Sequence, residues 1–128
     1  MAASRRYAPS HEWIRLEDDG TATVGISAYA VEALTDLVFM QLPEVGRRVK
    51  AGESFGEIES VKAVSDMYAP VAGEVVAVNA ELPQRLESLG QDPYEAGWIA
   101  RIKPDNPADI ESLLDQAAYD ALLAKQSH

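Results

Sequence analysis

The chain has 128 residues, 47% of them hydrophobic, and its 21 acidic and 11 basic residues give a formal net charge of −10. This length suits one hydrophobic core, so residues 1–128 are predicted to form a single domain. The negative charge disfavours nucleic acid, whose phosphates bind basic surfaces, and favours partner proteins with basic docking surfaces. The chain has no cysteine, which excludes disulfides, thiolate nucleophiles and cysteine-ligated metals.

The beginning of the chain carries no recognisable targeting signal. Residues 1–6 include two arginines, but no apolar stretch follows, and no apolar run approaches the roughly 20 residues that a membrane span needs. We therefore expect a cytoplasmic protein that does not enter a membrane. A mitochondrial protein after removal of its transit peptide would have a similar sequence.

The first predicted element is a β-hairpin. Residues 13–26 alternate between apolar and polar side chains, interrupted by an acidic turn with an Asp-Gly pair at 17–20. Ser27 is a suitable N-cap for a short helix over Ala28–Leu34. The next stretch, residues 37–42, is apolar and is predicted to be a strand.

The segments between residues 49 and 79 are short and separated by glycine and proline, which predicts a series of short strands. The chain also repeats a pattern when it is shifted by 27 residues against itself. The pairs brought together are Met40 and Met67, Pro43 and Pro70, Gly46 and Gly73, Val49 and Val76, and Gly52 and Asn79. This repeat predicts two similar halves that form a quasi-two-fold pair of sheets.

The last third of the chain is predicted to alternate helix and strand. A short helix is expected to end at Gly90, because glycine is favoured just after the last helical residue. Residues 98–102 are predicted to be a strand, and Asn106 with Pro107 to begin a helix whose apolar residues repeat through 110–123. The fold class is therefore mainly β: a flattened β-barrel/sandwich hybrid of short strands, with short helices and a C-terminal helix.

Lys62 is the candidate functional residue. Pairing Ser60 with Ala63 in a hairpin places Lys62 in the turn, and the same register sets Ile58 opposite Ser65. A lysine at such a tip extends into water, where an acylating enzyme can reach it, and a rigid hairpin holds it in place. Most lysines in turns are only surface residues, so position alone identifies no function.

Acidic residues surround the predicted tip. In the same register Glu57 opposes Asp66, and Glu59 lies one step nearer the turn; like charges that face each other across strands cost up to about 1 kcal/mol. This acidic collar suggests a recognition region that also includes Val61 and Ala63, although acidic residues on a hairpin face are usually only solubilising.

The hairpin sequence closely resembles the modification hairpin of the glycine cleavage system H protein family. The similarity is carried by residues 56–66 (GEIESVKAVSD) and 68–75 (YAPVAGEV), and further blocks match in order at 7–13, 24–30, 36–39, 42–46 and 93–98. It covers nearly the whole chain. Val31, Thr35, Leu86 and Gly90 depart from it, standing where relatives often carry glutamine, glycine, proline and asparagine, and they are expected to alter only turns away from the lysine.

The resemblance implies a lipoyl carrier rather than an enzyme, with lipoate joined covalently to Lys62. Such a carrier receives an aminomethyl group from P-protein (glycine decarboxylase), delivers it to T-protein (aminomethyltransferase) and is reoxidised by L-protein (dihydrolipoamide dehydrogenase). A lipoate-attaching enzyme is a further implied partner. We expect a monomer that binds neither nucleic acid nor membrane. The absence of cysteine agrees with this chemistry, because no protein thiol competes with the cofactor.

Glu12 is a candidate contact for the loaded arm. A methylene held between sulfur and an amine readily loses ammonia in water, so we hypothesise that the arm folds into a cleft where Glu12 binds the ammonium by a charge-assisted hydrogen bond. Alternatively, residues 11–13 simply begin a strand with Trp13 in the core. No metal site or catalytic residue is expected, because His11 and His128 are the only histidines and no nucleophile motif accompanies Ser10.

Three alternatives to an H-protein-like carrier differ from it in sequence or in an experimental outcome. Lipoyl domains of 2-oxo-acid dehydrogenases usually place aspartate before the lysine, and biotinyl domains place methionine on both sides, whereas Val61 and Ala63 flank Lys62 here. An unmodified β-sandwich interaction module would show no mass increase on the lysine. A stand-alone hydrolase would turn over substrate without any partner.

Overall fold

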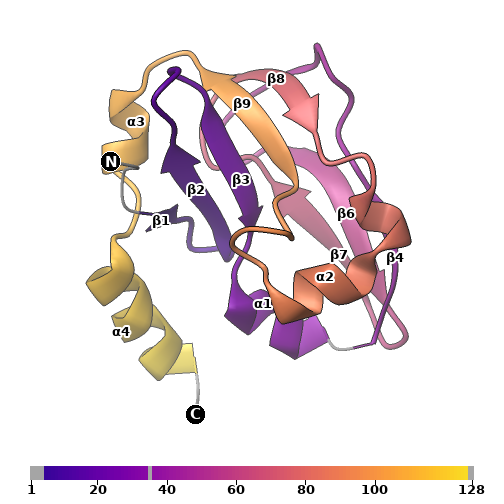
Figure 1. The fold of residues 1–128 in the computed structure, drawn as a ribbon. Helices are drawn as coiled ribbons and strands as arrows, with labels where there is room; N and C mark the ends of the chain where they lie inside the picture. The colour runs from indigo at the N-terminus through magenta and orange to yellow at the C-terminus, as the bar shows by residue number, and fades with distance from the viewer. Residues whose placement is uncertain (1–4, 35, 127–128) are drawn as a thin grey trace.

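Short antiparallel strands form two sheets in a computed structural model that describes residues 5–34 and 36–126 (Figure 1). The strands are β1 (Arg6–Tyr7), β2 (Glu12–Leu16), β3 (Ala22–Ile26), β4 (Leu37–Gln41), β5 (Arg48–Val49), β6 (Ser54–Ser60), β7 (Val64–Tyr68), β8 (Gly73–Val78) and β9 (Ala100–Pro104). Six form one sheet in the order β1-β2-β3-β9-β8-β5, and three form the other in the order β4-β6-β7. The mainly β class is confirmed as an open sandwich, whose described strands do not close into a barrel.

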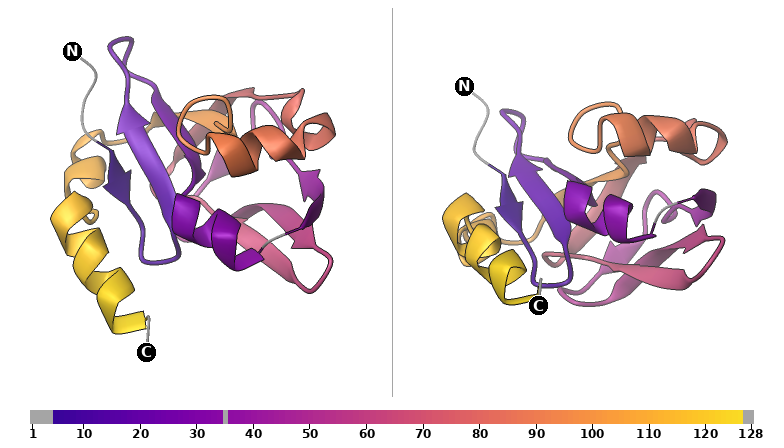
Figure 2. Two further views of the ribbon diagram at one scale, coloured as in Figure 1. Left: turned by 60° about the horizontal axis from the view of Figure 1, so that its bottom comes forward. Right: turned by 90° about the horizontal axis from the view of Figure 1, so that it is seen from below.

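The helices lie around the two sheets. They are α1 (Ala28–Leu34), the 3₁₀ turn η1 (Leu82–Gln84), α2 (Leu86–Gln91), α3 (Ala108–Glu111) and α4 (Gln116–Gln126). Helix α1 has the predicted bounds, and its N-cap is confirmed because the Ser27 hydroxyl accepts a hydrogen bond from the Ala30 amide at 3.3 Å. Figure 2 shows α4 beside β1, at the opposite end of the molecule from the β6–β7 hairpin.

The predicted N-terminal hairpin is confirmed by β2 and β3. Its turn places Gly20 at φ +88°, a conformation that glycine adopts without steric cost. The alternation of the sequence buries Ile14 and Val24 against the second sheet, where Ile58 and Met67 belong to the same core. Burial of these side chains between the sheets is the main stabilising contribution, at roughly 25 cal/mol per Å² of apolar surface.

Two of the predicted helix boundaries are wrong. Gly90 lies inside α2 instead of following it, because the chain continues for one more residue before the Asp92 amide closes the helix on the Ser88 carbonyl at 2.8 Å. The predicted C-terminal helix is divided into α3 and α4. The break occurs because Leu114 forms a β-bridge with Tyr7, with two backbone hydrogen bonds of 2.8 and 3.0 Å.

The internal repeat does not produce two equal halves. Met40 and Met67 do take similar buried places in the small sheet, on the two strands that flank β6. The glycine and asparagine of the repeat differ, however, because Gly52 has φ +83° while Asn79 is not among the described residues with positive φ. Each copy of the repeat passes from the small sheet to the large one, from β4 to β5 and from β7 to β8, but the sheets themselves are unequal, with six strands in one and three in the other.

The close packing of Trp13 on Gly25 gives a testable prediction for stability. A Cβ added to Gly25 would lie 2.6–2.8 Å from three atoms of the fully buried Trp13 indole. We expect Gly25→Ala to destabilise the protein by about 1–3 kcal/mol, the usual cost of overpacking a core. Urea unfolding measures the change. Gly90→Ala is the control, because a Cβ there would meet no heavy atom within 4 Å apart from the nearby backbone of its own helix. Equal unfolding midpoints for the two variants would contradict the packing argument.

Candidate functional site: an exposed lysine on a rigid hairpin

The turn between β6 and β7 has the predicted register. Ile58 pairs with Ser65 and Glu57 with Asp66. The Ser60 amide donates to the Ala63 carbonyl at 2.8 Å, which closes the hairpin around the two intervening residues. Lys62 is therefore at the tip, as predicted.

Side-chain and neighbouring backbone hydrogen bonds stiffen this turn. The Ser60 hydroxyl accepts hydrogen bonds from the amides of Lys62 at 3.3 Å and Ala63 at 3.1 Å. The carbonyl of Asp36, which directly precedes β4, accepts a hydrogen bond from the Val61 amide at 3.1 Å. The tip is thus fixed from both sides, and a group attached to Lys62 would pivot on its own bonds rather than on a flexible loop.

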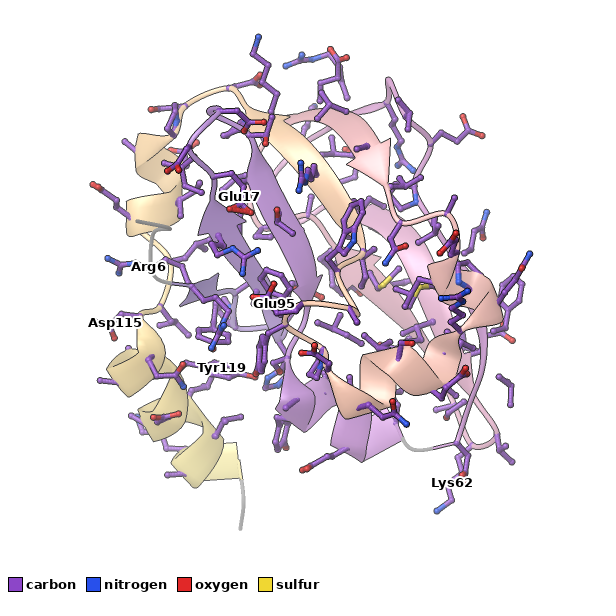
Figure 3. The ribbon with its side chains drawn as sticks, viewed as in Figure 1. Arg6, Glu17, Lys62, Glu95, Asp115 and Tyr119 are labelled. Atoms are coloured by element: carbon purple, nitrogen blue, oxygen red, sulfur yellow. The ribbon has the colours of Figure 1, made fainter. Side chains whose placement is uncertain are left out.

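The side chain of Lys62 points away from the protein. Figure 3 shows it projecting into solvent at the end of the hairpin. The residue is exposed, and none of the ion pairs among residues 5–34 and 36–126 involves it. An amine in this position is available to an enzyme that forms an amide, so the exposed tip fits a covalently attached acyl group.

The acidic collar lies on the outer face of the small sheet. Glu57 and Glu59 are half-buried between the flanking strands, whereas Asp66 is exposed. Phe39 pairs with Glu59 on one side and Val64 pairs with it on the other, so that this acidic residue stands between two apolar ones. The sequence correctly placed the three acidic residues near the lysine.

Sequence reasoning missed an apolar surface around the tip. Four large hydrophobic residues there are strongly exposed: Val61 by 71%, Val64 by 63%, Val38 by 57% and Phe39 by 48%. The signal was present in the apolar run at 37–42, which was interpreted only as a strand. Only Met40 of β4 is fully buried, so a patch of this kind next to an exposed lysine indicates a contact surface for another protein.

Glu12 is buried and already has two hydrogen-bond partners. It is only 2% exposed, and its carboxylate accepts hydrogen bonds from the Ser10 hydroxyl and, at 3.2 Å, from the Tyr68 amide. Burial raises the pKa of the Glu12 carboxyl above 4.5, an effect that these hydrogen bonds oppose. The carboxylate therefore joins β2 to the far end of β7, and Trp13 beside it is in the core as the alternative interpretation required.

The raised pKa of Glu12 gives a prediction for stability against pH. The folded state binds this proton more tightly than the unfolded chain, whose value is near 4.5. The contribution to stability is fully present below that pH and is lost as the pH rises through the folded pKa. We expect the unfolding free energy of the native protein to fall with rising pH relative to Glu12→Gln. Urea midpoints of both proteins from pH 4.5 to 7.5 measure this difference, and parallel curves would contradict it.

His11 belongs to a structural network rather than to a catalytic group. Its Nδ1 lies 2.8 Å from the Tyr119 hydroxyl, which lies 2.6 Å from the Ser27 hydroxyl. Burial raises the pKa of Tyr119 to about 12. The ring of Tyr119 also stacks on Tyr7 at 4.1 Å. These contacts fasten α4 to β1 and to the residues that precede β2 and follow β3.

A cavity lies between α1, α2 and the start of β4. Its volume is about 370 Å³, and its lining residues, which we call the α1–α2 groove, are Val31, Asp36, Leu37, Leu86, Glu87 and Gly90. Three of the four residues that depart from the family resemblance line it; the fourth, Thr35, lies outside the described residues. The Asp36 carbonyl, which belongs to a block that matches the family, accepts a hydrogen bond from the amide of Val61.

Comparison with known proteins agrees with the resemblance. The family model for the glycine cleavage H-protein matches residues 5–126. The glycine cleavage system H protein of Neisseria meningitidis serogroup C is 57% identical over 119 residues, which cover 93% of each chain. That of Opitutus terrae is 54% identical over 123 residues, covering 96% of this chain and 97% of the relative.

A solved structure extends this similarity to the fold. The crystal structure of a glycine cleavage system H protein from Mycobacterium marinum has a TM-score of 0.87 and 43% identity, over 97% of this chain and 99% of the other. Within residues 5–34 and 36–126, no helix has the length and apolar character needed to cross a membrane.

Proposed function

The chain belongs to the glycine cleavage H-protein family, and on this premise we propose that Lys62 carries lipoate in amide linkage. As an H protein it is a carrier component of the glycine cleavage system and not itself a catalyst. We further propose that it conveys the aminomethyl unit from P-protein to T-protein and is then reoxidised by L-protein. The observation that supports Lys62 as the attachment point is its exposed position on a hairpin tip held by Ser60 and Asp36.

The attached group, when present, supplies a disulfide that can accept and release a carbon unit. The chain itself supplies position and reach. The arm from the Lys62 Cα to the dithiolane ring measures about 14 Å by standard bond lengths. A hairpin held near its tip by two backbone–backbone hydrogen bonds and by the Ser60 hydroxyl places this arm at a fixed height above the small sheet. Three different partners would then meet it in the same orientation.

Recognition by the lipoate-attaching enzyme and the partners is assigned to the surface around the tip. Glu57, Glu59 and Asp66 provide negative charge, which complements a basic docking surface, and Val61 and Ala63 flank the lysine without charge. The exposed apolar side chains nearby add area that a partner can bury. Charge would steer the encounter, and the apolar contacts would stabilise it.

Glu12 is proposed to shelter the loaded arm. The Tyr68 amide that Glu12 binds lies six residues from Lys62, about 20 Å along the hairpin at ~3.3 Å per residue. An arm of about 14 Å, lengthened by the unit it carries and by one hydrogen bond, spans a similar distance. The ammonium of the loaded arm would then replace one of the two groups that donate hydrogen bonds to Glu12. Ser10 is the more replaceable of the two, because its hydroxyl can rotate.

The remaining assignments follow from the same premise. We propose that residues 1–128 form a single lipoyl-carrier domain, because one core cluster includes residues from both sheets. We also propose that the chain is a monomer, because a monomer leaves the hairpin tip free to meet each partner in turn. The cytoplasmic location expected from the sequence stays a prediction.

The proposed function is tested by exchange of bicarbonate into glycine in the presence of P-protein. The wild-type chain, lipoylated in vitro by a lipoate ligase, is expected to support exchange, and the same preparation without lipoate is expected to support none. Comparable exchange by the two preparations would contradict the assignment, since a carrier cannot act without its acyl group.

A further inference from the structure

The turn between β1 and β2 leads into Glu12 and has an uncommon backbone. Within it, the His11 amide donates to the Ala8 carbonyl at 2.9 Å, and the Ala8 amide donates to the Glu12 carbonyl at 2.8 Å. His11 has φ +80°, in the left-handed region that residues with a Cβ adopt uncommonly. Such a conformation persists only where surrounding contacts hold it. The direction in which Ser10 and Glu12 leave the turn therefore depends on what holds His11.

Two contacts from distant parts of the chain hold His11. Its Nδ1 lies 2.8 Å from the hydroxyl of Tyr119 in α4, and its carbonyl accepts a hydrogen bond from the Ser27 amide at 2.9 Å. The Tyr119 hydroxyl also lies 2.6 Å from the Ser27 hydroxyl. One hydroxyl thus ties the imidazole of His11 to the same residue, Ser27, that already binds its backbone.

The environment of Tyr119 suits a fixed contact of this kind. The residue is only 2% exposed, and its ring stacks on that of Tyr7 in β1 with the two planes 1° apart. Figure 3 shows Tyr119 between α4 and the strands. Because burial raises the pKa of Tyr119 to about 12, the hydroxyl keeps its proton near neutral pH. It therefore acts as a neutral hydrogen-bonding group.

The carboxylate of Glu12 depends on this turn for one of its two partners. It accepts a hydrogen bond from the Tyr68 amide of β7 at 3.2 Å and another from the hydroxyl of Ser10, which lies in the turn itself. Strand pairing with Ile26 holds the backbone of Glu12, whereas the position of Ser10 depends on the turn. A change of backbone at His11 would move Ser10 away from Glu12 and expose the carboxylate to water.

We propose that Tyr119 is a positioning residue for Glu12. It acts through His11, because its hydroxyl holds the left-handed turn that keeps Ser10 against the carboxylate. This inference rests on the proposed sheltering of the loaded arm by Glu12 and deepens it. The C-terminal helix, at the opposite end of the molecule from the β6–β7 hairpin, thereby contributes to the lifetime of the aminomethyl unit.

Tyr7 provides a matched control for this role. Its hydroxyl donates a hydrogen bond to the side chain of Gln116 in α4 at 2.8 Å. Tyr7→Phe and Tyr119→Phe each remove one hydroxyl from the same pair of stacked rings, and each removes a hydrogen bond that attaches α4. Only the hydroxyl of Tyr119 is the one within hydrogen-bond distance of His11 Nδ1. A general loosening of α4 would therefore give the two variants the same phenotype, whereas positioning of Glu12 would not.

The first test measures hydrogen exchange of the Tyr68 amide by NMR in the unmodified chain. This amide donates to the Glu12 carboxylate, so its exchange rate reports how firmly that carboxylate is held. We expect Tyr119→Phe to accelerate the exchange about fivefold, as the loss of one neutral hydrogen bond would do. Tyr7→Phe is expected to leave the rate unchanged.

The second test measures ammonia release from the loaded protein. We expect Tyr119→Phe to accelerate the release roughly threefold, less than Glu12→Gln does because the carboxylate is still present. In a Glu12→Gln background the same substitution is expected to add nothing, since its effect passes through that carboxylate. If Tyr119→Phe does not fold, His11→Asn takes its place, because asparagine tolerates the left-handed backbone but is shorter than imidazole.

The outcomes separate this inference from the proposed function. Equal ammonia release from Glu12→Gln and the wild type would overturn both the sheltering by Glu12 and the role of Tyr119, and would leave lipoylation of Lys62 standing. Faster release from Glu12→Gln, with wild-type rates for Tyr119→Phe in either measurement, would overturn the role of Tyr119 alone. Equal effects of Tyr119→Phe and Tyr7→Phe would also overturn it, because they would trace the change to the attachment of α4.

Discussion

Replacement of Lys62 by arginine is expected to abolish the transfer of the aminomethyl unit altogether. Arginine keeps the positive charge and the length of the side chain, but its guanidinium does not form the amide that attaches lipoate. The residue is exposed and has no ion-pair partner among the described residues, so the fold should be unaffected. Exchange of bicarbonate into glycine with P-protein measures the loss.

Lys50 provides the matched control for this substitution. It is an exposed lysine in a turn, like Lys62, but it lies after β5. Lys50→Arg is expected to be lipoylated and to support exchange at the wild-type rate. Residual exchange by Lys62→Arg above the level of the unmodified chain would mean that another residue carries the group.

Glu12→Gln is expected to accelerate the loss of ammonia from the loaded protein by roughly tenfold, the factor that corresponds to about 1.4 kcal/mol. Hydrogen bonds to charged groups contribute about 1.5–3 kcal/mol, and the buried position of Glu12 keeps competing water away. Glutamine has nearly the same shape but no charge with which to hold an ammonium. Ammonia released over time from the isolated, loaded protein is the measurement.

Glu17→Gln is the control for this second experiment. Glu17 is a half-buried carboxylate that follows β2, where it accepts a hydrogen bond from Thr23 and pairs with Arg15 at 3.2 Å. Its removal changes the net charge by the same amount, so the release rate should stay unchanged. Equal rates of ammonia release from Glu12→Gln and the wild type would contradict this role, and Glu12 would then serve only as a structural link between β2 and β7.

The parts of the fold that the sequence predicted depend on local interactions. The β6–β7 register follows from the pairing of Ser60 with Ala63, and α1 follows from the cap at Ser27. The break between α3 and α4 depends instead on the bridge from Leu114 to Tyr7, which are distant in sequence. No periodicity within residues 110–123 could indicate it.

The same distinction applies to the site. Lys62 and its acidic neighbours could be placed from hairpin geometry alone. The partners of Glu12 could not, because Tyr68 reaches it from another sheet. The α1–α2 groove brings together residues from two helices and a strand, which no local pattern could indicate. From the sequence, Gly90 was interpreted as a helix terminator, because the open space beside it is visible only in the folded chain.

Tryptic mapping of the lipoylated protein tests the attachment at Lys62 most directly. Trypsin cleaves after unmodified lysine and arginine, and the chain has such residues at 50, 62 and 85. We predict an uncut peptide of residues 51–85 that is heavier by one lipoyl group. Cleavage after residue 62 in a protein that has gained that mass would place the group on a different side chain and contradict the account.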